Sequence, residues 1–266
     1  MSDFVMQEAR FWSRSVGQRV TYRTLAPDDH DPGRPLPLIV HLHGAMSSAA
    51  FLDTAKPIYD RAWASGNLPP AVVVCASTPT SGGFYIDFAN GPAWETLVGT
   101  ELPEQLEADF DLSGIRAAIG FSMGGYGALK LAARNPDRYR AVAALCPAVF
   151  PAERADEVPA RNRPAILGEL NQAMGKGIDG YSDNCIPTLI RHRRDAIAAS
   201  GLRIFLECGE RDEFGLYDGA LHLHRVLESL QLPHDWVSLP EAGHADAVAE
   251  RLAKAIDALG EALKWP

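Results

Sequence analysis

The sequence predicts an α/β fold, in which a mostly parallel central sheet carries helices on both faces. Three observations predict it. Residues from about 10 to 25 alternate apolar and polar, which is typical of an antiparallel hairpin. Short apolar runs then alternate with segments of helical character, the pattern of parallel strands joined by helices. At one such joint, residues 120–124, an apolar run passes into a helical segment through Gly-Phe-Ser-Met-Gly.

Each expected strand is a short apolar run with turn residues at its ends. The initial hairpin turns at 16–20, where Gly17 interrupts the alternation. The runs at 38–42 and 71–76 are rich in β-branched residues, as buried strands are. Four further strands are expected at 115–121, 139–146, 202–207 and 235–239.

Helices are expected between these strands, where residues of high helix propensity gather. Ser47 or Ser48 can cap the first helix, which extends to about residue 64. The others are expected at 95–110, 128–134, about 216–230 and from about 246. Residues 147–200 have no strand pattern and are interrupted by Pro and Gly, so an excursion of loops and short helices is expected there. Neither an interdomain linker nor a repeat is evident, and a single domain over 1–266 is expected.

The composition excludes several classes of protein. Apolar residues make up 47% of the chain and charged residues 22%, which is ordinary globular usage and excludes disorder. The formal net charge is −9, and the one basic run, 191–194, is expected to be a solvated helix face, so no nucleic-acid partner is expected. The sequence shows no membrane-spanning stretch and no signal-peptide pattern at its start, so a cytoplasmic location is expected.

The cysteines give no indication of a cofactor. They have no C-x-x-C spacing and no histidine at ligand spacing. Three of the four fall in or at the end of expected strands, where Cys acts as a small hydrophobic residue. Neither a metal, a disulfide nor another cofactor is expected from Cys75, Cys146, Cys185 and Cys208.

Ser122 is the candidate nucleophile. It lies in the G-x-S-x-G pattern between an expected strand and an expected helix, which is the context that this motif requires. Such a turn forces the serine into a sparsely populated backbone conformation, and the flanking glycines remove Cβ atoms that would collide. The N-terminus of the following helix supplies the N–H of Met123 and a favourable dipole for an oxyanion.

A serine hydroxyl needs a neighbouring base held in one tautomer by an acid. The carboxyl ends of parallel strands form one edge of a sheet, and only His43 and His244 follow expected strand ends. His43 precedes the serine, whereas α/β-hydrolases have the order serine, acid, histidine, so we expect His244 to be the base. Asp212, just past the strand at 202–207, is the expected acid. The competing carboxylates are Glu207, Glu210 and Asp218.

The loop after the strand at 38–42 is expected to complete the oxyanion hole. A second N–H donor is needed beside that of Met123, and the Ala45 amide is the first candidate, with Met46 as the alternative. Gly44 in the same loop is a candidate substrate-binding residue. A base with an ordinary histidine pKa near ~6.5 predicts activity that rises through roughly pH 6–7.

Two stretches resemble a known family. The first, Gly-Phe-Ser-Met-Gly-Gly-Tyr-Gly-Ala-Leu at 120–129, is similar to the nucleophile turn of the esterase D group of α/β-hydrolases. That group includes the S-formylglutathione hydrolases, and feruloyl esterases and mycolyltransferases are more distant relatives. The second resembles a series in S-formylglutathione hydrolases and comprises Gly83-Phe84-Tyr85-Ile86-Asp87, Pro92-Ala93-Trp94 and Glu101-Leu102-Pro103. The resemblance covers most of the chain and implies an α/β-hydrolase fold with serine esterase chemistry.

The chain departs from that group at two places. Where the S-formylglutathione hydrolases have a cysteine shortly after the oxyanion loop, this chain has Ser47 and Ser48. Around the catalytic histidine they carry an aromatic Tyr-Asp-His-Ser-Tyr-Tyr type of segment, where residues 242–246 are Ala-Gly-His-Ala-Asp. Both departures concern glutathione recognition and leave the candidate catalytic residues in place.

We therefore expect a serine carboxylesterase that acts on small soluble esters. The alternatives are a thioesterase of the S-formylglutathione hydrolase type, an acyltransferase on the same fold, and a catalytically inactive binding protein. Phe84, Tyr85 and Trp94 are candidates for the substrate wall, or else aromatic residues that close a loop over the core. The expected partner is a small-molecule ester, and the sequence leaves a homo-oligomer open.

Overall fold

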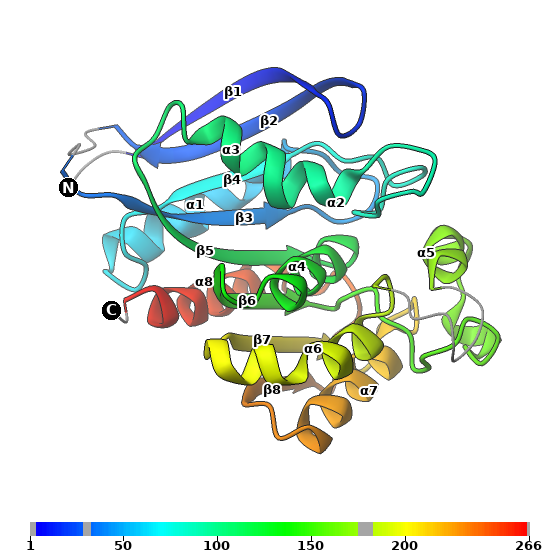
Figure 1. The fold of residues 1–266 in the computed structure, drawn as a ribbon. Helices are drawn as coiled ribbons and strands as arrows, with labels where there is room; N and C mark the ends of the chain where they lie inside the picture. The colour runs from blue at the N-terminus through cyan, green and yellow to red at the C-terminus, as the bar shows by residue number, and fades with distance from the viewer. Residues whose placement is uncertain (1–3, 29–32, 175–182, 265–266) are drawn as a thin grey trace.

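An eight-stranded sheet runs through the computed structural model, which describes residues 4–28, 33–174 and 183–264 (Figure 1). The strand order is β1-β2-β4-β3-β5-β6-β7-β8. β1 (Phe4–Ser13) and β2 (Gln18–Pro27) form the expected antiparallel hairpin, and β2 pairs antiparallel with β4 (Val72–Ala76). All other pairs are parallel, as predicted. Those strands are β3 (Leu36–Leu42), β5 (Leu112–Phe121), β6 (Tyr139–Leu145), β7 (Arg203–Gly209) and β8 (His234–Leu239).

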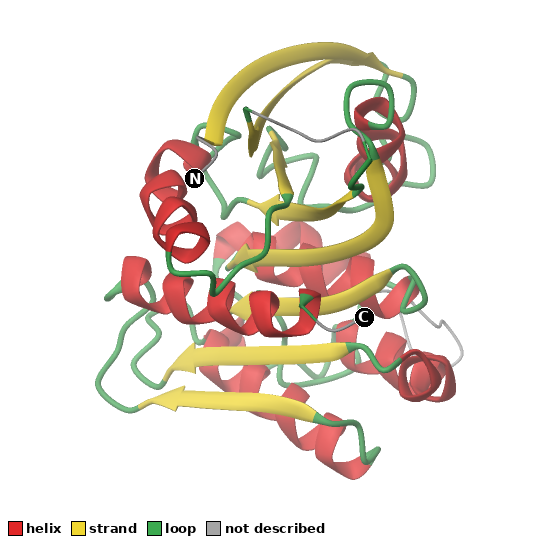
Figure 2. Ribbon diagram, turned by 90° about the vertical axis from the view of Figure 1, so that its left-hand side faces the viewer, coloured by secondary structure: helices red, strands yellow, loops and turns green. Residues whose placement is uncertain are grey.

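Helices cover both faces of the sheet (Figure 2). On one face lie α1 (Phe51–Ala64) and α8 (Val248–Leu263). The central strands are apolar on both sides, because Leu38 and Val40 face one helical layer while Ile39 between them faces the other. The second layer contains α2 (Trp94–Thr96), α3 (Leu102–Leu106), α4 (Met123–Arg134), α6 (Ile186–Ser200) and α7 (Leu216–Ser229).

The single helix expected at 95–110 is instead broken. A π-helical turn, Leu97–Glu101, separates α2 from α3. Pro103 has no backbone N–H, so it cannot donate to the carbonyl oxygen of Gly99 four residues earlier. The Arg116 guanidinium on β5 donates to that oxygen instead, at 3.1 Å. The prediction of a cap at Ser47 or Ser48 is also wrong, because α1 begins after Ala50 without a side-chain cap.

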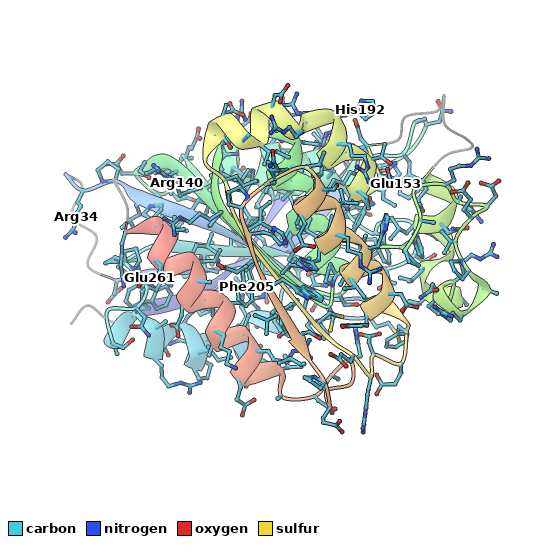
Figure 3. All side chains as sticks on the ribbon, turned by 90° about the horizontal axis from the view of Figure 1, so that it is seen from below. Arg34, Arg140, Glu153, His192, Phe205 and Glu261 are labelled. Atoms are coloured by element: carbon cyan, nitrogen blue, oxygen red, sulfur yellow. The ribbon has the colours of Figure 1, made fainter. Side chains whose placement is uncertain are left out.

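The excursion is shorter than the sequence predicts. Residues 186–200 form α6, a full helix of the covering layer, whose buried residues include Ile186, Leu189 and Ile197. The basic run lies on the outer side of this helix, where His192 projects away from the molecule (Figure 3). Within 147–185 the described helices are short, namely Ala160–Asn162, Ala165–Leu167 and α5 (Gly168–Ala173), while 175–182 fall outside the described residues.

β5 passes into α4 through a single residue, Ser122, whose φ of 57° and ψ of −117° place it in a strained region. The backbones at this turn approach very closely. A Cβ atom on Gly120 would lie 2.2 Å from the carbonyl group of Gly124, and one on Gly124 would lie 1.9 Å from the carbonyl oxygen of Leu42 at the end of β3. Both positions therefore require glycine because a side chain would collide with neighbouring backbone atoms, more than because the backbone needs the flexibility of glycine.

We predict that Gly124→Ala destabilises the protein by about 3 kcal/mol or more, because rigid backbone atoms occupy the space that the methyl group needs. The matched control is Gly168→Ala, since a Cβ atom at Gly168 meets nothing within 4 Å and should change stability by less than about 0.5 kcal/mol. Denaturant unfolding measures both. Equal stability of the two variants would contradict the close approach of α4 and β3.

Candidate active site

The loops that carry the candidate residues meet at one edge of the sheet. They follow the carboxyl ends of β3, β5, β7 and β8, which is the edge where α/β sheets form their sites. In Figure 1 this edge lies on the right, on the same side as the excursion that contains α5. The topology therefore brings Ala45, Ser122, Asp212 and His244 to one region from distant parts of the sequence.

Backbone hydrogen bonds fix Ser122 from two sides. Its N–H donates to the carbonyl oxygen of Leu145 at 2.9 Å, at the end of β6. Its carbonyl oxygen accepts from the N–H of Ala148 and of Tyr126, each at 3.1 Å. The segment that follows β6 thus holds the strained turn in place, and α4 begins directly behind it.

Asp212 and His244 form a direct pair. Oδ2 of Asp212 lies 2.6 Å from Nδ1 of His244, and the two side chains are 0% and 12% exposed. Oδ1 of Asp212 accepts from the backbone N–H groups of Phe214 and Leu216 at the start of α7. Burial acts to raise the pKa of Asp212, but His244 and these N–H groups outweigh it and lower that pKa. An ionised Asp212 fixes the proton of neutral His244 on Nδ1.

The other carboxylates that compete in the sequence are engaged elsewhere. Glu207 is bound to Arg251, with Oε1 at 2.7 Å from Nη2. Glu210 accepts from the Ser238 hydroxyl at 2.6 Å. Asp218 accepts from Arg161 and Asn162 at 3.0 and 2.9 Å. Of the four acidic candidates only Asp212 bonds to His244.

The His244 ring lies between two aromatic side chains. Its centroid is 4.8 Å from that of Phe121, the residue before Ser122, and 4.8 Å from that of Phe214. Ser122 and His244 share no hydrogen bond among the described residues. Catalytic hydrogen bonds are often long without substrate and shorten in the complex. Phe121 connects the two residues instead, because it precedes Ser122 in the chain and its ring contacts the ring of His244.

The charge around His244 favours its protonated form. Burial acts to lower the pKa of His244, but the hydrogen bonds and charges of Asp212 and Cys146 overcome this and raise the pKa to about 9. Cys146 directly follows β6. This residue was not predicted as part of the site, and its effect moves the expected rise of activity to higher pH.

The oxyanion loop lies against the Ser122 turn. A Cβ atom on Gly44 would be 3.8 Å from Cβ of Ser122. The N–H of Met46 donates to the Thr80 hydroxyl at 2.6 Å, so it is occupied. Within the described part of the chain, no hydrogen-bond partner is found for the N–H groups of Ala45 and Met123. Of the two alternatives from the sequence, Ala45 is therefore the residue with a free donor.

His43 orients the peptide that carries this donor. Its Nε2 accepts from the N–H of Thr78 at 3.0 Å, which leaves the proton of the neutral ring on Nδ1. Nδ1 then donates to the carbonyl oxygen of Gly44 at 2.8 Å. Because the C=O of Gly44 and the N–H of Ala45 belong to one planar peptide, this bond fixes the direction of the N–H. Burial lowers the pKa of His43 and keeps the ring neutral.

The aromatic residues proposed for the substrate wall lie beneath the site. Phe84, Tyr85 and Trp94 are only 1%, 0% and 3% exposed. The Tyr85 hydroxyl donates to the carbonyl oxygen of His43 at 3.1 Å, and Trp94 donates to that of Gly82 at 2.8 Å. This placement agrees with the alternative, in which these aromatic residues close a loop over the core.

Arg251 on α8 holds the loop that carries His244. Its Nη1 donates to the carbonyl oxygens of His244 and Asp246 at 3.0 and 3.1 Å. Its Nε lies 2.8 Å from Oε2 of Glu207 on β7. Sequence reasoning missed Arg251, although its spacing of four and eight residues from Ala255 and Leu259 places a charge on the apolar stripe of α8.

One group of side chains in this region has the composition of a metal site. Ligand atoms of Cys146, Asp212 and His244 all lie within 4.8 Å of one another. The Arg251 guanidinium is 2.7 Å from Sγ of Cys146, and Nδ1 of His244 is already bonded to Asp212. A cation next to the sulfur opposes a second cation there, so we assign no metal to the group.

The sheet topology, the strained serine turn and the histidine loop after the last strand define an α/β-hydrolase fold. The chain belongs to the Esterase family, whose model matches residues 13–229. No helix in the described residues is both long and apolar enough to cross a membrane.

Proteins that resemble this chain in sequence or fold include S-formylglutathione hydrolases and a ferulic acid esterase. The S-formylglutathione hydrolase of Mus musculus is 31% identical over 142 residues, which are 51% of this chain and 45% of that protein. The match therefore spans less than half of that relative. A ferulic acid esterase has a TM-score of 0.80 at 18% identity and covers 98% of this chain and 99% of its own. The S-formylglutathione hydrolase of Agrobacterium tumefaciens has a TM-score of 0.70 at 19% identity, with 98% and 94% covered.

A general base at His244 predicts that kcat/KM for a neutral ester rises with pH at a midpoint well above 6.5, towards about 9. Only the neutral ring can accept the serine proton, so a raised pKa moves the rise to higher pH. The measurement is kcat/KM from pH 5 to 10 at constant ionic strength. A midpoint at or below ~6.5 would show that the anionic surroundings do not act on the base.

Proposed function

We propose that this protein is a serine carboxylesterase that hydrolyses small soluble esters through an acyl-enzyme on Ser122. The observation that carries the proposal is the 2.6 Å bond between Asp212 and His244 at the sheet edge where the Ser122 turn lies. The family, the backbone conformation of Ser122 and the free N–H groups of Ala45 and Met123 support it.

In the proposed mechanism, His244 removes the hydroxyl proton of Ser122 through Nε2, and the alkoxide attacks the ester carbonyl carbon. Asp212 keeps the other ring proton on Nδ1 and stabilises the imidazolium that forms. The imidazolium then gives its proton to the leaving alcohol. Water attacks the acyl-enzyme by the same route, which releases the acid and restores Ser122.

The oxyanion of each tetrahedral intermediate is bound by two backbone donors. The Met123 N–H lies at the first residue of α4, where the helix dipole also favours negative charge. The Ala45 N–H is aimed by the bond from His43 to the Gly44 carbonyl. Removal of one such donor typically costs about 10²–10³ in kcat, so this pair supplies a large share of the proposed catalysis.

The surroundings favour a small oxygen ester over an anionic thioester. The rings next to His244 are the apolar Phe121 and Phe214. Two of the three arginines in the basic run that could attract an anion are already paired with carboxylates, Arg191 with Glu153 and Arg194 with Asp195. A chain of formal charge −9 offers glutathione no general attraction either. The matching S-formylglutathione hydrolase of Mus musculus makes the thioester the second candidate.

We predict that Ser122→Ala lowers kcat for p-nitrophenyl acetate by at least ~10³-fold, because the three catalytic groups act as a unit. The melting curve should show a folded protein, since the substitution removes only the hydroxyl oxygen. Steady-state kinetics and circular dichroism measure the two properties. A folded variant that keeps a tenth of the wild-type activity would exclude Ser122 as the nucleophile.

We also predict that kcat/KM for p-nitrophenyl acetate or butyrate matches or exceeds that for S-formylglutathione. Recognition of glutathione requires placed donors, and Ala242 and Ala245 beside His244 provide no side-chain donor. The two activities are measured side by side at one pH and salt concentration. If kcat/KM for the thioester exceeds that for the oxygen ester by more than about a hundredfold, or ~2.7 kcal/mol, the thioesterase hypothesis is correct instead.

A further inference from the structure

Two thiols lie in contact directly behind the proposed catalytic site. Cys146 follows β6 and Cys208 lies on the neighbouring strand β7, with their Sγ atoms 3.4 Å apart. The register pairs Leu145 with Glu207, the residues immediately before them. Neighbouring strands are ~4.8 Å apart, which falls within the ~4.4–6.8 Å between Cα atoms that a disulfide spans. Both cysteines are free and fully buried.

The two thiols have different surroundings. Nη2 of Arg251 donates to Sγ of Cys146 at 2.7 Å, and the thiol of Cys208 donates to the same sulfur. The thiol of Cys208, with His244 and Arg251, lowers the pKa of Cys146 against the effect of burial. The same contact, together with burial, raises the pKa of Cys208. Cys146 is thus the more acidic thiol of the pair, and Cys208 is its neighbour.

We propose that Cys146 and Cys208 are a reversible oxidation site, in which a hydroperoxide converts the two thiols into a disulfide that switches off the esterase. The formation of the disulfide is independent of the function proposed above, whereas its effect on activity rests on that function.

The chemistry has two steps. The Cys146 thiolate attacks one oxygen of hydrogen peroxide, the O–O bond breaks, and the products are a sulfenic acid on Cys146 and hydroxide. Cys208 then attacks the sulfenic sulfur. The S–S bond forms as the S–O bond breaks, and the departing hydroxide takes the Cys208 proton to leave as water. Two thiol sulfurs lose two electrons to the peroxide, and a dithiol such as dithiothreitol reverses the reaction by exchange.

A disulfide at this place disturbs the proposed nucleophile through the backbone. The two sulfur atoms must approach from 3.4 Å to the ~2.05 Å of a disulfide. Cys146 lies between Leu145, which accepts the Ser122 N–H, and Ala148, which donates to the Ser122 carbonyl oxygen. The φ of Cys146 is 39°, which is already a strained value, so the backbone at this residue cannot readily accommodate a further shift.

The disulfide also removes an anion beside the proposed base. A thiolate on Cys146 binds the Arg251 guanidinium, which supports the loop of His244. A neutral disulfide weakens this contact, so the loop loses part of its support. The sulfur of Cys146 lies within 4.8 Å of a ring nitrogen of His244, whose side chain is 12% exposed, so the oxidant must be a small molecule such as hydrogen peroxide.

The test is oxidation of the reduced protein by hydrogen peroxide in three forms: wild type, Cys208→Ala and Cys185→Ala. Cys185 is the matched control, because it is also buried, at 3% exposed, but contacts the hydroxyl of Thr188 and no second thiol. Intact mass and peptide mapping follow the thiols, and hydrolysis of p-nitrophenyl acetate is followed before and after dithiothreitol. The exposed Met46 can gain oxygen in all three forms, but dithiothreitol does not reverse that change.

We expect wild type and Cys185→Ala to lose two hydrogens, to yield a cross-linked peptide of Cys146 and Cys208, and to lose activity at least tenfold until dithiothreitol restores it. Cys208→Ala should hydrolyse the ester before oxidation, form no cross-link, and carry a sulfenic acid on Cys146 that dimedone traps. If both thiols of the wild type remain free after peroxide treatment, the proposed oxidation site is wrong. If the cross-linked enzyme remains fully active, the proposed switch is wrong. If the wild type hydrolyses no ester, the proposed function fails, while the mass data still decide the oxidation site.

Discussion

The structure depends on the close approach of two backbones at the turn around Ser122. The carbonyl oxygen of Leu42 occupies the position where a side chain at Gly124 would begin, so α4 starts against the end of β3. This approach holds Ser122 in its strained conformation and brings the start of α4 next to the loop that follows β3.

A second constraint holds the proposed base, His244. His244 lies in a loop outside the strands and helices, and the Arg251 guanidinium joins that loop to β7 through Glu207. Both partners of the ion pair are almost fully buried, and removal of one partner from such a pair typically costs about 3–5 kcal/mol. The donors of Arg251 are shared among a carboxylate, backbone carbonyl oxygens and the sulfur of Cys146. This arrangement makes one side chain responsible for the position of the loop and for the charge next to it.

Most of the architecture could be predicted from the sequence, because it depends on patterns that are local in the chain. The hairpin, the apolar strands and the serine turn are examples, and the positions of Asp212 and His244 after strand ends placed both at one edge. The broken helix around Pro103 depends on Arg116 from another strand, which no local pattern contains. Arg251 and Cys146 act through contacts more than 40 residues apart in the chain, with Glu207 and Cys208, so spacing alone could not reveal them.

The account is tested most directly by the site of covalent modification with a fluorophosphonate, which reacts with an activated serine and leaves a stable adduct. Peptide mapping of the modified protein should place one adduct per chain on Ser122, on the peptide that joins β5 to α4. An adduct on another residue with Ser122 unmodified, or no adduct on an enzyme that hydrolyses esters, would contradict the central claim that this turn carries the nucleophile.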